Sequence, residues 1–276
     1  MAQKTVGFQA CAPAGVECTV IAKYKKDPST RKLAEYLEPF FGGGTVEPIR
    51  VYLGGTRKGY STQRTLKGSK GVCANLNPAK AEQRRRLIHG APRGTVLELY
   101  AGKGYLTKDV YARKAKRAIL VDKDKRALAA ADRRLKGKVR REIYAGDNRK
   151  WIREKMVDVD LSDLVAVDFD AFGSPMDTMQ IFFDNYKVRR PLYVSLTDGS
   201  TLAYSFHRET DGPQMAKKHY HSRIGRKEMG TVRGQVKMID RFMKEEGRKH
   251  GFTAEPISIA KGRSKTLYVG YLLKPA

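Results

Sequence analysis

From Val72 onward, short apolar runs alternate with segments of helical periodicity, and no other feature restricts the possible folds as strongly. Strands that alternate with helices in this way are typical of a parallel α/β sheet. The expected strands are 95–100, 118–122, 141–145, 164–170, 191–199, 256–260 and 266–273. The last two are separated by a short polar turn and predict an antiparallel pair. The predicted fold class is therefore α/β: a seven-stranded Rossmann-like sheet that ends in an antiparallel hairpin.

Helices are expected between these strands. They are 77–89, a segment from the glycine turn to about 116, 125–135, a segment that starts at Ser174-Pro175, and 229–250. Asn77-Pro78 and Ser174-Pro175 suit helix starts, because Pro fits the first turn and Asn or Ser can cap it. Asp177 is spaced from Ser174 to complete a capping box.

Residues 1–71 do not follow this pattern and are predicted to form a small N-terminal α+β extension to a main domain over 72–276. Strands are expected at 19–24 and 46–53, with a helix over 28–41 between them. The extension ends in 54–71, which carries basic residues and an aromatic but no acid. We interpret 54–71 as a candidate nucleic-acid-binding arm, with a solvated linker as the alternative.

Positive charge dominates the composition, since 55 Lys and Arg residues stand against 29 Asp and Glu, for a net charge of +26. Each phosphate that a basic protein neutralises releases counterions, so this excess favours a nucleic acid as partner. A second basic segment, 217–227, also interleaves cations with aromatic rings. The candidate nucleic-acid-binding residues are Arg57, Lys58, Tyr60, Arg64, Lys217, Lys218, Tyr220 and Arg223. The basic runs at 84–86 and 133–141 are interpreted as solvated helix faces.

Other partner classes are disfavoured. His219 and His221 form a His-x-His pair, but no nearby carboxylate or cysteine completes a metal site, so no metal is expected. Three scattered cysteines do not make a disulfide framework, which favours a reducing, cytoplasmic location. No run approaches the roughly 18 apolar residues of a membrane helix, so no membrane partner is expected.

Three loops that follow expected strands carry residue types that bind nucleotide-like ligands. In the first, Glu98 precedes a G-x-G turn whose glycines let a ligand approach the backbone closely. The second begins with Asp122, about twenty residues beyond the glycines, where a carboxylate can accept ribose hydroxyls. In the third, Gly146-Asp147-Asn148, the acid either contacts a ligand or caps the next helix. The candidate cofactor-binding residues are Glu98, Ala101, Gly102, Gly104, Asp122, Lys123, Asp147, Asn148 and Asp168.

The most specific string is D-F-D-A-F-G-S-P at 168–175, just beyond a buried-strand run. The turn E-L-Y-A-G-K-G at 98–104 resembles motif I of class I S-adenosylmethionine-dependent methyltransferases more closely than the G-x-G-x-x-G dinucleotide fingerprint. The string at 168–175 resembles the fourth motif of nucleic-acid amino-methyltransferases, above all the Asp-Pro-Phe-Gly-Ser-Pro of the tRNA guanine-N2 dimethyltransferase family. S-L-T-D at 195–198 and Asn77-Pro78 are also similar to segments of that family. The likeness covers about residues 72–205.

The resemblance implies S-adenosylmethionine as cofactor, with Asp147 near its adenine amine and Asp168 near its methionine end. It also implies a catalytic group after the fourth strand. Asp170 would accept a hydrogen bond from the target amine, and the carbonyl of Ala171 would orient that nitrogen. Phe172 would stack on the unstacked target base. Ala171 stands where the family has proline, which makes the backbone less rigid there.

These features predict a methyltransferase that modifies an exocyclic amine of a nucleic-acid base. RNA is favoured over DNA, and guanine N2 of tRNA is the first candidate. Two alternatives stay open: an adenine or cytosine amino-methyltransferase acting on DNA or rRNA, and an inactive nucleic-acid-binding protein with a methyltransferase fold. A nicotinamide oxidoreductase is disfavoured by the glycine spacing and by the charge.

Overall fold

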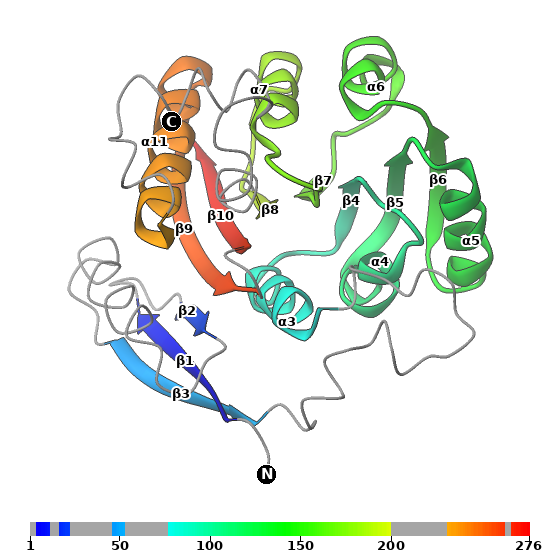
Figure 1. Ribbon diagram of the computed structural model, residues 1–276. Helices are drawn as coiled ribbons and strands as arrows, with labels where there is room; N and C mark the ends of the chain where they lie inside the picture. The colour runs from blue at the N-terminus through cyan, green and yellow to red at the C-terminus, as the bar shows by residue number, and fades with distance from the viewer. Residues whose placement is uncertain (1–3, 12–16, 23–45, 53–76, 200–230, 263–265) are drawn as a thin grey trace, which may run out of the picture.

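The computed structural model describes residues 4–11, 17–22, 46–52, 77–199, 231–262 and 266–276 (Figure 1). The strands are β1 (Lys4–Cys11), β2 (Glu17–Ala22), β3 (Val46–Tyr52), β4 (Gly94–Leu99), β5 (Ala115–Asp122), β6 (Arg140–Ala145), β7 (Leu164–Phe169), β8 (Leu192–Asp198), β9 (Phe252–Lys261) and β10 (Leu267–Pro275). The α-helices are α3 (Pro78–Leu87), α4 (Tyr105–Asp109), α5 (Lys125–Leu135), α6 (Asn148–Glu154), α7 (Met176–Asn185) and α11 (Val232–His250).

Seven of the strands form the predicted mixed sheet, in the order β6-β5-β4-β7-β8-β10-β9. Strands β4 to β8 pair in parallel, whereas β10 is antiparallel to both β8 and β9. The predicted Rossmann-like sheet with a terminal antiparallel hairpin is therefore confirmed. Because β4 to β8 are parallel, the loops at their carboxyl ends share one edge of the sheet.

The N-terminal strands continue this sheet beyond β9. Strand β2 pairs in parallel with β9 through Thr19–Ile21, and β1 pairs antiparallel with both β2 and β3. The strands predicted at 19–24 and 46–53 correspond to β2 and β3, but β1 was not predicted. The predicted helix over 28–41 and the basic segment 54–71 lie outside the described residues.

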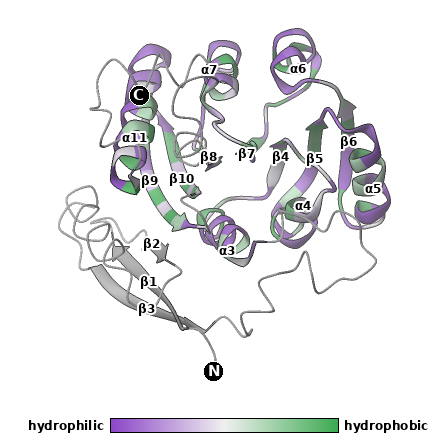
Figure 2. Ribbon diagram, viewed as in Figure 1, coloured by the Kyte–Doolittle hydropathy of each residue, from purple (hydrophilic) through white to green (hydrophobic). Residues whose placement is uncertain are grey.

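Helices cover both faces of the sheet (Figure 1). The largest apolar cluster joins the sheet to α6, α7 and α11, while two smaller clusters join the other face to α3, α4 and α5. In Figure 2, α5 and α11 each show hydrophilic and hydrophobic residues, as expected for helices that cover a sheet on one side. The apolar strands β4 and β7 lie between these layers and are buried along their whole length.

Helix α5 forms over the predicted residues for local reasons. Asp124 caps it, because its carboxylate accepts hydrogen bonds from the backbone N–H groups of Arg126 and Ala127 at 2.9 and 3.0 Å. Leu128 and Ala131 then lie on the buried face. No helix in the described part of the chain is long and apolar enough to cross a membrane.

Two helix predictions were wrong in detail. The helix expected to run to about 116 ends at Asp109, and a short 3-10 turn over 111–113 follows before β5 begins. This break turns the ring of Tyr111 into the protein, where it is fully buried. Helix α7 begins at Met176 with Pro175 in the capping position, so Ser174 does not start the helix as the expected capping box requires.

Candidate active site

The turn after β4 has an unusual backbone conformation. Tyr100, Gly102 and Gly104 have φ angles of +64°, +53° and +67°, in the left-handed region that favours glycine. A Cβ on Gly104 would also lie 2.9 Å from the Cβ of Ala131, so α5 packs directly against this turn. Ala101, directly before the first of these glycines, is fully buried. A tight, close-packed turn of this kind brings backbone N–H groups to the sheet edge.

Asp122, at the end of β5, is bonded to this turn. One carboxylate oxygen accepts the N–H of Gly102 at 2.8 Å, and the other accepts the N–H of Asp124 at 2.8 Å. The side chain remains partly exposed, and the neighbouring Lys123 is exposed. The glycine turn and the carboxylate that the sequence singled out separately thus form one unit.

Glu98 is buried beneath the same turn. One carboxylate oxygen accepts hydrogen bonds from the N–H, at 3.2 Å, and the hydroxyl of Thr107. Burial, followed by the nearby charge of Asp168, raises the pKa of Glu98 to about 8. The other oxygen, Oε1, is buried without a hydrogen-bond partner among the described residues. An unpaired buried acceptor is unfavourable and calls for a donor.

The loop after β6 is organised by a helix cap. Asp147 accepts hydrogen bonds from the N–H groups of Arg149 and Lys150 at 3.0 and 3.1 Å and so caps α6. Asn148 is buried, and its Oδ1 has no hydrogen-bond partner in the described part of the chain. The capping role expected as one alternative for Asp147 is present, and the residue is exposed.

The string at 168–175 lies beside the glycine turn. The N–H of Asp170 donates to the carbonyl of Leu99, the last residue of β4, at 3.4 Å. Ala171 is buried, but the ring of Phe172 is fully exposed, at 105% of its reference area. The carbonyl of Gly173 accepts the N–H of Gly199 at 2.8 Å, which joins the loops after β7 and β8. The structure therefore brings the candidate catalytic and cofactor-binding residues to one sheet edge.

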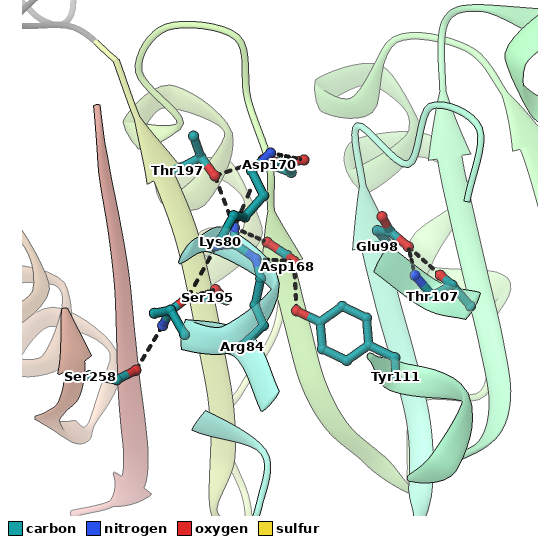
Figure 3. Close-up of polar contacts among 11 residues, drawn as sticks. Lys80, Arg84, Glu98, Thr107, Tyr111, Asp168, Asp170, Ser195, Thr197 and Ser258 are labelled. Carbon is teal, nitrogen blue, oxygen red and sulfur yellow. Dashed lines mark hydrogen bonds and ion pairs between the residues drawn. The ribbon is translucent and has the colours of Figure 1, made fainter. Parts of the chain in front are cut away.

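Asp170 is paired with a residue that the sequence did not single out (Figure 3). Lys80 Nζ lies 2.5 and 2.7 Å from the two carboxylate oxygens, and both side chains are buried. The Thr197 hydroxyl donates to Oδ1 of the same carboxylate at 2.6 Å. Lys80 comes from the first turn of α3, which Asn77 caps with its side chain.

Asp168 has a second buried partner from α3. Arg84 donates two hydrogen bonds to its carboxylate, at 2.8 and 2.9 Å, and Tyr111 donates a third at 2.6 Å (Figure 3). Burial alone would lower the pKa of Arg84, but the charge and hydrogen bonds of Asp168, together with Tyr111 and Asp170, outweigh burial and raise that pKa. Arg84 also donates to the Thr197 hydroxyl at 2.9 Å, so Thr197 links the two ion pairs.

The interpretation of 84–86 as a solvated helix face was wrong for Arg84, which is fully buried, although Arg85 is exposed. A signal for both cations was present in the sequence. Asp168 lies near the end of the otherwise apolar strand β7 and Asp170 directly follows that strand, and carboxylates are almost never buried without a partner. Lys80 and Arg84, four residues apart on a helix that immediately precedes the sheet, have the spacing to serve both.

The remaining candidates lie elsewhere. All the predicted nucleic-acid-binding residues, in 54–71 and 217–227, fall outside the described residues, as do His219 and His221. Within the described ranges, no group of three or more His, Cys, Asp and Glu side chains is arranged to hold a metal ion.

Comparison with known proteins defines the fold. No protein-family model matches the chain, and no curated protein sequence does either. Among solved structures, Trm1 from Pyrococcus horikoshii, in complex with S-adenosyl-L-methionine, matches with a TM-score of 0.50 and 18% identity over 72% of this chain and 54% of that one. The chain thus spans about half the length of that protein.

Two further structures match less well. The N-methyltransferase NodS from Bradyrhizobium japonicum, in complex with S-adenosyl-L-homocysteine, has a TM-score of 0.47 and 14% identity over 79% of this chain and 98% of its own. Trm5b from Pyrococcus abyssi has a TM-score of 0.43 and 14% identity over 72% and 49%. The strand order and the match to Trm1 show that this chain has the class I methyltransferase fold.

Proposed function

We propose that this protein is an S-adenosylmethionine-dependent methyltransferase that acts on an exocyclic amine of a nucleic-acid base, with RNA favoured over DNA and guanine N2 of tRNA as the first candidate. The observation that carries the proposal is the contact between Asp170 and the end of β4. It joins the two loops that a methyl transfer needs, one for the cofactor and one for the amine.

The donor groups of S-adenosylmethionine fit the acceptors that the site leaves unpaired. Glu98 Oε1 and Asn148 Oδ1 are buried acceptors with no partner among the described residues, and the cofactor carries an ammonium and an adenine amine. Asp122 is a partly exposed carboxylate suited to ribose hydroxyls. When bound, the cofactor supplies a methyl group on a positively charged sulfur.

The residues of the loop after β7 would orient the target amine for reaction. An exocyclic amine is a weak nucleophile, because its lone pair is delocalised into the base. Acceptors that bind its N–H groups, here the Asp170 carboxylate and the Ala171 carbonyl, turn the lone pair toward the methyl group and stabilise the charge that develops on nitrogen. The exposed ring of Phe172 would hold the base by stacking.

The nucleic-acid substrate is supported by charge and by the string at 168–175. A net charge of +26 favours a polyanion, and a flipped base explains why a fully exposed aromatic ring stands at the edge of the site. The resemblance of that string to the tRNA guanine-N2 dimethyltransferase family favours guanine N2 over the amines of adenine and cytosine.

The direct test is methyl transfer from labelled S-adenosylmethionine into total RNA and total DNA, followed by nucleoside analysis. Label in N2-methylguanosine from RNA is the expected result. Label in an adenine or cytosine of either polymer would replace guanine N2 as the target. Cofactor binding without any incorporation would overturn the proposed activity.

One observation favours the second candidate, a nucleic-acid-binding protein without activity. The Asp170 carboxylate is already held by Lys80 and Thr197, as an inert structural carboxylate would be. Tight binding of RNA, together with no incorporation and no binding of S-adenosylmethionine, would support this candidate.

A further inference from the structure

We propose that Lys80 is a positioning residue for the methyl-transfer site: its ammonium keeps the buried Asp170 carboxylate charged and aimed, so that one oxygen can accept the target amine. This inference rests on the proposed function and assigns a new residue to it.

The contact is a buried ion pair with defined geometry. Lys80 Nζ lies 2.5 Å from Oδ1 and 2.7 Å from Oδ2, and the side chains are 5% and 1% exposed (Figure 3). Lys80 is held in the first turn of α3, where Asn77 and Pro78 fix the start of the helix. The lysine is thus attached to a rigid element and not to a loop.

Asp170 needs a cation of its own because its surroundings oppose a charge. A carboxylate taken out of water takes up a proton unless a positive group stabilises the ionised form. A protonated Asp170 would be a poorer acceptor for an amine. The titratable and charged groups that face Asp170 are Lys80 and Arg84 on α3, Asp168 on β7, Glu98 on β4 and Tyr268 on β10.

Arg84 cannot replace Lys80 in this role. Its guanidinium donates two hydrogen bonds to Asp168, and its nearest nitrogen is 3.9 Å from Asp170. The spacing of the two cations suits the spacing of the two acids. Lys80 and Arg84 are four residues apart and so lie on one face of α3, and Asp168 and Asp170 are two residues apart and so lie on the same side of the chain. Each cation therefore serves its own carboxylate.

The pairing leaves one acceptor direction of the Asp170 carboxylate unused. A carboxylate offers about four lone-pair directions. Lys80 uses one on each oxygen, and Thr197 uses the second on Oδ1. One direction on Oδ2 has no partner among the described residues, and an amine that reaches this buried carboxylate would bind there without displacing Lys80.

The test is the pH profile of kcat for Lys80→Met against the wild type. Without the ammonium, burial favours the neutral form of Asp170, so kcat of Lys80→Met should fall relative to the wild type by up to about tenfold for each unit that the pH is lowered and recover as the pH is raised. The wild type should show no such fall. Lys80→Arg keeps the charge and should restore the wild-type profile, and Arg85→Met, on the exposed face of α3, is the matched control.

A Lys80→Met profile that parallels the wild type would overturn the inference, because a merely structural lysine would lower activity equally at every pH. If Lys80→Met does not fold, Lys80→Gln, which donates a hydrogen bond without a charge, carries the same test. Failure of the proposed function is distinguishable: the wild-type protein itself would then transfer no methyl group at any pH.

Discussion

Phe172 and Val157 are the large apolar side chains that stand exposed in the described part of the protein. An exposed aromatic ring contributes little to folding, so Phe172→Ala should leave the free energy of unfolding within about 0.5 kcal/mol of the wild type. If the ring stacks on the target base, its loss should lower kcat/KM for RNA by about 5- to 150-fold, because stacking on one base is worth about 1–3 kcal/mol.

The matched control for Phe172 is Val157→Ala, at 83% exposure and on the short 3-10 turn before β7. It should change neither stability nor methyl transfer. Equal activity of Phe172→Ala and wild type, measured with the same RNA, would remove Phe172 from the substrate site.

Glu98 should make the stability of the protein depend on pH. Its pKa rises from 4.5 to about 8 in the folded protein, mainly through burial. Between these values the unfolded chain releases a proton that the folded protein keeps. The free energy of unfolding should therefore fall as pH rises, by up to about 1.4 kcal/mol per unit. Glu98→Gln, which mimics the protonated form, should lose this slope.

Denaturant unfolding of the cofactor-free protein at several pH values between about 5 and 8 measures the effect of Glu98. Glu154→Gln, on the exposed side of α6, is the control and should keep the wild-type slope. If Glu98→Gln and wild type lose stability in parallel, Glu98 is ionised in the folded protein despite its burial.

At the scale of the element, two buried ion pairs, Lys80–Asp170 and Arg84–Asp168, connect helix α3 to the sheet. Arg84→Met would remove the cation that is paired with the buried Asp168 carboxylate and would leave the hydrogen bond from Tyr111. Arg85→Met removes an exposed ion pair with Glu82, at 3.2 Å. Removing one partner of a buried ion pair costs about 3–5 kcal/mol, and removing a surface pair costs about 0–1 kcal/mol. We expect Arg84→Met to lower the free energy of unfolding by the larger amount.

Thermal and denaturant unfolding of the two neighbouring variants compares the same chemical change one residue apart. A similar small loss for Arg84→Met and Arg85→Met would mean that α3 separates from the sheet easily and that its ion pairs do not hold it.

The elements that could be predicted from the sequence are those set by local patterns. Helix α5 was predicted over 125–135 because that segment is rich in Ala and Leu, and β4 and β7 because they are short apolar runs. Strand β1 was missed because its apolar residues are interrupted and because its partners, β2 and β3, are other segments of the chain. Pairing between distant segments leaves no local mark in one sequence.

The same limit applies to the site. Asp122, Glu98 and the glycine turn could be predicted, because their spacing within the chain reflects their geometry. The two acids near a buried strand indicate that cationic partners exist, but the sequence does not identify Lys80 as the partner of Asp170, because 90 residues separate them. A run of charged residues on a helix is usually solvated, and only the sheet opposite the helix shows which of them are buried.

At the scale of the whole molecule, the excess of positive charge is not explained by the site. The cations that the site uses, Lys80 and Arg84, are neutralised by carboxylates within it. A net charge of +26 must therefore reside on surfaces and in segments away from these pairs. Charge of this size accelerates and strengthens binding to a polyanion without specifying its sequence.

The salt dependence of RNA binding can locate the phosphate contacts. We expect the affinity of the wild type for RNA to fall steeply with salt, with a slope in log–log form of about 0.7 for each phosphate contact with a single strand. If Arg57, Lys58 and Arg64 contact phosphates, changing all three to Glu should weaken binding and reduce that slope by about 2. The control changes the same number of charges in Arg133, Lys136 and Lys138, which are exposed and lie in the last turn of α5 and in the segment between α5 and β6, at the sheet edge opposite the site. Both triple variants alter the net charge equally, so long-range attraction should weaken equally in both. A slope that falls only in the first variant would assign the contacts to 54–71, whereas equal slopes in the two variants would show that 54–71 contributes only general attraction.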